Sequence, residues 1–153
     1  RDSPEKGFRF LKVNYKYLQE KNIKINSAGW TLNSTKSCKS FQNTSSFEIK
    51  KLLDQCNILV VTSNADYQPR VVWEAINLNK PVLVTSNILH FNYLSALFPS
   101  IYHYEHNNIN SFISKIFLII NDLKLNKKVL ISKRNFKDMQ SHIDLSAWIN
   151  HLK

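Results

Sequence analysis

The chain has 153 residues, of which 43% are hydrophobic, including nine Phe, six Tyr and three Trp. This length and aromatic content exclude a disordered chain and suffice for one domain with its own core. No apolar run reaches the roughly 18 to 20 residues that a membrane-spanning helix needs. The 21 basic residues exceed the 11 acidic ones, giving a formal net charge of +10. That charge favours an anionic partner, which can be a phosphate-bearing ligand, a nucleic acid or an acidic lipid surface.

The cysteines and histidines carry no metal or disulfide pattern. Cys38 and Cys56 lack the CxxC spacing, and no signal-peptide pattern is present, so we expect reduced thiols and a cytoplasmic protein. The five histidines are His90, His103, His106, His142 and His151. They show no metal-ligand spacing, so we expect no metal site.

A helical pattern over residues 7–21 follows a loop that carries Arg1 and Lys6. The first N–H groups of a helix lack partners and the helix dipole is positive there, so basic residues at this place can help to bind an anion. The alternative is that Arg1 and Lys6 are solvated charges near a chain end. Residues 23–28 alternate like a strand and lead to Gly29, which permits close backbone approach to a ligand or to a neighbouring helix.

The middle of the chain alternates strands with helices. A short strand is expected at 38–41, and Ser45 with Glu48 forms a capping box ahead of a helix at 47–55. We expect the apolar face of this helix to be Phe47, Leu52 and Leu53. Two β-branched runs at 57–62 and 81–85 flank a helix at 70–78, whose apolar positions are Val71, Val72, Ala75 and Ile76.

The last third continues the same alternation. Residues 88–98 are expected to be helical in part, 101–104 a strand, 109–125 a helix, and 145–152 a last helix. The apolar positions of the 109–125 helix are Phe112, Ile113, Ile116, Phe117 and Ile120. Strands and helices that alternate in this way predict a single α/β domain with a Rossmann-like parallel sheet between helices.

The loop at 63–70 is the expected ligand site, because open parallel sheets bind ligands beyond the carboxyl ends of their strands. Asp66 lies on this loop and Glu74 lies a turn inside the next helix, so the two carboxylates can converge on one polyhydroxyl ligand. The alternative is that Asp66 is an exposed turn residue and Glu74 is a charge on the helix surface. The apolar neighbours of Glu74 favour a bound partner, because a carboxylate in an apolar segment needs one.

Two separated motifs resemble those of the C-terminal, donor-binding domain of retaining glycosyltransferases of the GT-B fold, the family called glycosyl transferases group 1. That family has an Arg after its first strand and a Lys-Gly at the next helix, and here Arg1 and residues 3–7 (SPEKG) match. Its glutamate-x7-glutamate motif is matched by residues 66–75 (DYQPRVVWEA), followed by NKPVLVTS. Residues 141–152 (SHIDLSAWINHL) are similar to the closing helix of the family.

The resemblance implies a nucleoside-diphosphate sugar as substrate and a role for each matching residue. Arg1 and Lys6 would be catalytic, stabilising the diphosphate as the glycosidic bond breaks. Asp66 and Tyr67 would face the donor sugar, and Glu74 would bind the ribose. The phosphate site would comprise Arg1, Lys6, Gln68, Pro69 and Arg70, with backbone approach at Gly29 and no metal or other cofactor.

The resemblance also implies a longer enzyme. The chain matches one half of a GT-B cleft and lacks the N-terminal acceptor domain, so the isolated domain is expected to be inactive alone. The whole enzyme would transfer the sugar to a glycan or lipid-linked acceptor in polysaccharide biosynthesis, in the cytoplasm or peripherally on the cytoplasmic face of an anionic membrane.

The residues leave two other functions open. Asp66 and Tyr67 stand where the family has Glu and Gly, Asn79 stands where it has another glycine, and residues 88–90 stand where it has a glycine pair. These changes favour a degenerate, non-catalytic GT-B-like interaction domain. The net charge alone favours a basic nucleic-acid-binding domain, although no nucleic acid is expected under the glycosyltransferase interpretation.

Overall fold

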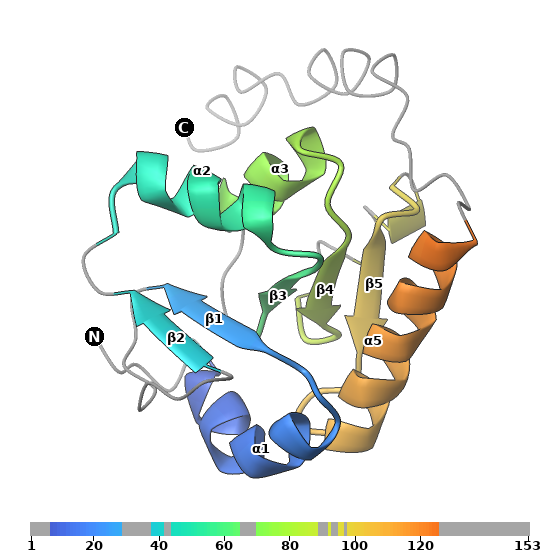
Figure 1. The fold of residues 1–153 in the computed structure, drawn as a ribbon. Helices are drawn as coiled ribbons and strands as arrows, with labels where there is room; N and C mark the ends of the chain where they lie inside the picture. The colour runs from blue at the N-terminus through green and yellow to red at the C-terminus, as the bar shows by residue number, and fades with distance from the viewer. Residues whose placement is uncertain are drawn as a thin grey trace, which may run out of the picture.

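The structure is a computed structural model that describes residues 7–28, 38–41, 44–64, 70–88, 92, 95–96 and 98–125. Helices alternate with strands along these residues (Figure 1). The elements are α1 (Phe8–Glu20), β1 (Ile25–Ala28), β2 (Cys38–Phe41), α2 (Ser46–Gln55), β3 (Leu59–Val61), α3 (Arg70–Asn77), β4 (Val82–Thr85), β5 (Ile101–Tyr104) and α5 (Ile109–Lys124).

All the strand pairs in the described residues are parallel, and they form two sheets. β1 pairs with β2, with Ile25 opposite Cys38, and the second sheet has the order β3-β4-β5. In the second sheet Leu59 is opposite Val82, and Val82 is opposite Ile101. The predicted α/β class with parallel strands and a Rossmann-like arrangement is confirmed.

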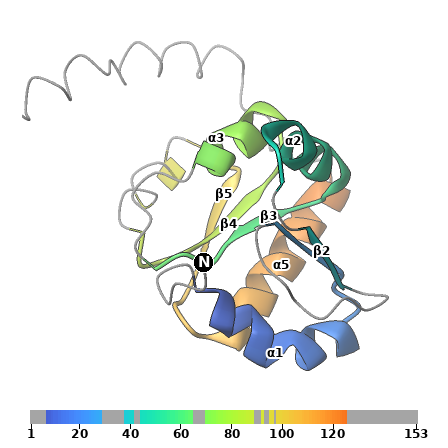
Figure 2. The same cartoon turned by 90° about the vertical axis from the view of Figure 1, so that its left-hand side faces the viewer.

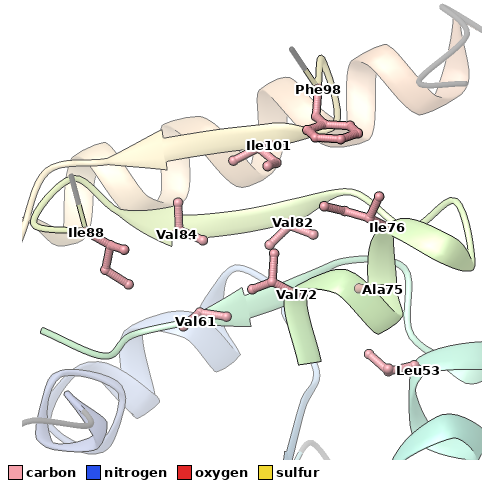
Figure 3. Packing of buried hydrophobic residues seen from close by; sticks show 10 residues of the cluster. All are labelled: Leu53, Val61, Val72, Ala75, Ile76, Val82, Val84, Ile88, Phe98 and Ile101. Carbon is pink, nitrogen blue, oxygen red and sulfur yellow. The ribbon is translucent and has the colours of Figure 1, made fainter. Parts of the chain in front are cut away.

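The helices form one layer on each face of the strands. Val82 and Val84 of β4 belong to a buried cluster with α3 and with Leu53 of α2, and Figure 3 shows these side chains pointing toward one another. Leu83, between them, belongs to a cluster with α1 and α5 on the other face. Because successive side chains of a strand point to opposite faces, β4 is buried on both. Figure 2 shows the strands between the α1–α5 and α2–α3 layers.

Caps and turns explain where several helices begin and end. Ser45 accepts a hydrogen bond from the Glu48 backbone N–H, and the Glu48 carboxylate accepts one from the Ser45 N–H, which confirms the predicted capping box. The turn after α3 uses Asn79 at a φ of 54°, and the turn after α1 uses Asn22 at 57°. Asn tolerates this left-handed backbone better than most residues, so short turns can follow both helices.

Two predicted apolar faces need correction. Phe47 is 78% exposed, and α2 instead packs through Leu53, with Ile49 partly buried beside it. Phe117 of α5 is 49% exposed, whereas Ile119 is fully buried. In both helices the apolar residue that points inward is set by the rotation of the helix on the sheet, which the local sequence leaves open.

Two helices predicted from the sequence lie wholly or partly outside the described residues. The predicted helix at 145–152 lies outside the described residues. Of the predicted 88–98 helix the structure describes residues 88, 92, 95–96 and 98, and of these 92, 95 and 96 are helical. In the part of the chain that is described, no helix is both long and apolar enough to cross a membrane.

Candidate functional site

The carboxyl ends of β3, β4 and β5 lie at one edge, because the three strands are parallel. Polar residues follow or end these strands: Ser63 comes after β3 and Thr85 ends β4, and both side chains are buried. The helices α3 and α5 begin after β3 and β5, so their N-termini lie toward the same edge. Open parallel sheets bind ligands at such an edge, which makes it the candidate site.

The start of α1 reaches this edge through a backbone contact. Gly7, the N-cap of α1, has a φ of 66° and lies against the residue that follows β3. A Cβ atom on Gly7 would overlap the Thr62 carbonyl oxygen and lie 2.7 Å from the carbonyl carbon. Only a glycine permits both this backbone conformation and this contact, so Gly7 fixes the N-terminus of α1 beside the carboxyl end of β3.

The N-terminus of α1 has the features of an anion site. Gly7 makes no side-chain cap hydrogen bond, and the first turn holds no acidic residue. By contrast, Ser45 caps α2, and Asn108 caps α5 by accepting from the Ser111 N–H at 3.0 Å. The positive end of the α1 dipole, with Arg9 exposed in the first turn, therefore faces an edge where an anion would be stabilised.

Arg70 and Glu74 share the exposed face of α3. They lie four residues apart, and both side chains are exposed, whereas Val72, Ala75 and Ile76 are buried beneath them. The apolar neighbours of Glu74 therefore do not by themselves call for a bound partner: they point inward while Glu74 points to solvent, as in the alternative of a helix-surface charge. Glu74 is accessible to a ligand, but its burial does not call for one.

The remaining predicted site residues lie outside the described residues: Arg1, Lys6, Gly29, Asp66, Tyr67, Gln68 and Pro69. Their roles stay predictions. What the structure does bring together is the two segments to which they attach. Gly7, directly after Lys6, contacts Thr62, which lies a few residues ahead of Asp66 in the sequence.

Sequence reasoning missed two hydrogen bonds of His106 at the same edge. The Asn107 amide lies 2.8 Å from Nε2 of His106, and Nδ1 of His106 lies 3.4 Å from the hydroxyl of Thr85. An amide NH₂ donates, so Nε2 accepts and Nδ1 carries the proton toward Thr85. The signal that could have found the contact of Thr85 with His106 is positional, since Thr85 ends β4 and His106 follows β5.

The chemistry of the edge is that of helix N-termini and hydroxyl groups. Within the described ranges, no three His, Cys, Asp or Glu side chains gather in a way that could hold a metal ion. The residues there can donate to phosphate or hydroxyl oxygens.

No family model, no curated protein and no solved structure matches this chain.

Proposed function

We propose that the chain binds a nucleoside-diphosphate sugar at the carboxyl edge of its sheet, as the donor domain of a retaining glycosyltransferase of the GT-B type. The observation that carries this proposal is the contact of Gly7 with Thr62. It supports the proposal because it joins the segment that ends in Lys6 and Gly7 to the strand that leads into Asp66. These are the two segments on which the resemblance rests.

The reaction would need the protein mainly to stabilise charge. As the bond from the anomeric carbon to the diphosphate breaks, negative charge develops on the diphosphate. The start of α1, whose N-cap Gly7 makes no side-chain cap hydrogen bond, would direct the positive end of the helix dipole toward that charge, and Arg1, Lys6 and Arg70 would add positive side chains. Backbone amides between Tyr67 and Arg70 would complete the phosphate site.

Two carboxylates would hold the rest of the donor. Asp66, with Tyr67 beside it, would bind hydroxyl groups of the sugar. Glu74 would accept hydrogen bonds from the ribose, and its exposure on the first turns of α3 supports such access. The acceptor, a glycan or a lipid-linked sugar, would be bound by an N-terminal domain of the longer enzyme, with an anionic membrane as a further contact.

Calorimetric titration of the chain tests the proposal. UDP, UDP-glucose and GDP-mannose serve as nucleotide probes, and inorganic pyrophosphate tests the phosphate site without a base or sugar. We expect at least one nucleotide to bind, and we expect binding to weaken about tenfold or more in Lys6→Ala, because one charge-assisted contact is lost.

Matched surface variants separate local from general effects. Lys12 and Glu20 are exposed on α1, so Lys12→Ala and Glu20→Ala change the net charge as Lys6→Ala and Glu74→Ala do. Binding that is equal in all four variants, or no nucleotide binding by the folded chain at millimolar concentration, would reject the proposal. Binding of DNA or RNA in the absence of the nucleotide probes, with a steep salt dependence, would favour the nucleic-acid alternative.

A further inference from the structure

The exposed apolar side chains gather on one of the two helix layers. Of the seven large apolar side chains that are exposed in the described residues, six lie on α1, on α5 or at the C-cap of α5: Val13, Tyr17, Phe117, Leu118, Leu123 and Leu125. The seventh, Phe47, lies on α2. Because α1 and α5 pack on the same face of the strands (Figure 2), their exposed sides both point away from the sheet on that side.

Positive charge gathers on the same layer. The exposed charged side chains of α1 and its C-cap are four basic ones and one acidic one: Arg9, Lys12, Lys16 and Lys21, with Glu20. The exposed charges of α2 and α3 are balanced, three basic and three acidic: Lys50, Lys51 and Arg70, with Glu48, Asp54 and Glu74. The α1–α5 face is our name for the basic residues of α1 and its C-cap together with Val13, Tyr17, Phe117 and Leu118.

Tyr17 and Lys21 show how apolar and basic groups combine on this face. The Lys21 ammonium lies over the Tyr17 ring, 5.6 Å from its centroid. Val13, one turn earlier on α1, is 73% exposed. Tyrosine rings favour the boundary between lipid headgroups and acyl chains, and lysine side chains can lie along apolar surface while their ammonium groups reach the headgroups. The face therefore suits a layered partner, with negative charge above an apolar interior.

We infer that the α1–α5 face docks on an anionic lipid surface. Anionic headgroups would attract the basic side chains of α1, and Val13 and Phe117 would enter the boundary of the acyl chains. The net charge favours an anionic partner without placing it, whereas the separation of charge between the two helix layers assigns it to this face.

Docking on this face leaves the carboxyl edge of the sheet open. That edge lies at the N-terminal ends of α1 and α5, whereas lipid would contact the outer sides of the two helices. The inference supplies the surface for the membrane contact of the proposed function, and it rests on that function only for the orientation of the donor site. Docking itself requires no nucleotide.

Co-sedimentation of the full chain with vesicles tests the charged part of the face. The vesicles are phosphatidylcholine with about one third phosphatidylglycerol, and pure phosphatidylcholine is the neutral reference. Lys12→Glu with Lys16→Glu changes α1, and Lys50→Glu with Lys51→Glu makes the same change in net charge on α2. We expect the α1 pair to weaken binding to the anionic vesicles at least about tenfold and the α2 pair less than about threefold, because attraction to the surface falls off within a Debye length.

Phe117→Ser and Phe47→Ser test the apolar part, since each removes an exposed phenylalanine from one of the two layers. We expect Phe117→Ser to weaken binding about threefold or more and Phe47→Ser to leave it unchanged. Circular dichroism shows that each variant is folded. No binding to anionic vesicles at low salt, equal binding to neutral vesicles, or equal losses in the two members of either matched set would overturn the inference.

Calorimetry with nucleotides in the absence of vesicles keeps the two proposals apart. Loss of nucleotide binding by a chain that still docks on anionic vesicles rejects the donor site and supports the docking face. Nucleotide binding by a chain that ignores anionic vesicles rejects the docking face alone.

Discussion

Gly7 and Thr62 come from segments far apart in the sequence, yet no side chain separates their backbones. The glycine has a φ of 66°, and its α-carbon faces the Thr62 carbonyl group so closely that a Cβ has no room. This contact ties the first turn of α1 to the carboxyl end of β3. The proposed donor site depends on it.

Replacing Gly7 with Ala should destabilise the fold strongly. The added Cβ meets backbone atoms of Thr62, which cannot rotate away, and Ala also disfavours the positive φ. We expect the free energy of unfolding to fall by about 2–4 kcal/mol, from the strain and the overpacking together. Urea denaturation followed by circular dichroism measures it.

Asn79→Ala is the control that separates the backbone strain of a positive φ from the steric overlap with Thr62. Asn79 has a φ of 54° in the exposed turn after α3, so the substitution tests the backbone conformation alone. We expect a loss of about 1 kcal/mol there. Equal losses in Gly7→Ala and Asn79→Ala would contradict the close contact with Thr62.

Leu53→Ala and Phe47→Ala should differ sharply although both lie on α2. Leu53 is 4% exposed within a buried cluster, whereas Phe47 is 78% exposed. Removing the buried side chain leaves a cavity, and we expect a loss of about 2–5 kcal/mol for Leu53→Ala, against at most about 0.5 kcal/mol for Phe47→Ala. Thermal unfolding of both variants checks this order, and a larger effect at Phe47 would show that α2 is rotated differently.

Lys80 should stabilise the end of α2. Its ammonium group donates to the carbonyl oxygens of Asp54 and Cys56, each 2.9 Å away. These carbonyls lie at the C-terminal end of α2, where a positive charge is favourable. We expect Lys80→Met to lower the free energy of unfolding by about 1–2 kcal/mol. The exposed Lys51→Met on α2 is the matched control, and an equal effect of both substitutions would contradict a local role for Lys80.

The capping box should make stability depend on acid pH. The Ser45 backbone N–H and hydroxyl both donate to Glu48, at 2.7 and 2.9 Å, and lower the pKa of that carboxyl from its ordinary 4.5. A lowered pKa in the folded state means that the stabilisation is present above pH 4.5 and is lost as the pH falls through the lowered value. Melting temperatures between about pH 7 and pH 3 should therefore fall less in Glu48→Gln than in the unmodified chain. Parallel curves would contradict the prediction.

The thiol of Cys56 should react slowly with alkylating agents. Burial raises its pKa above the ordinary 9.0, although the positive charge of Lys80 acts to lower it. The thiol also donates a hydrogen bond to the Leu53 carbonyl at 3.3 Å. Because the thiolate is the reactive form, alkylation by iodoacetamide near neutral pH should be slower in the folded Cys38→Ser variant than in the same variant in urea. Equal rates would show an accessible thiolate.

Local sequence determined most elements of the fold. Continuous β-branched residues marked β4, helical spacing marked α5, and Ser45 with Glu48 marked the start of α2, because each of these signals depends on neighbours in the chain. Alternation of strands with helices was then enough to predict parallel pairing, since a helix between two strands returns the chain to the same edge.

The tertiary structure decided what depends on distant segments. The sequence could not show that Glu74 faces solvent, because its apolar neighbours are buried by sheet contacts made elsewhere. Nor could it show that His106 bonds to Thr85, which requires β4 and β5 to end side by side. Gly7 was visible as one of only two glycines, but the reason for a glycine at that position is the Thr62 carbonyl. A backbone contact across the fold leaves no periodic signal in the chain, so only the packed structure reveals it.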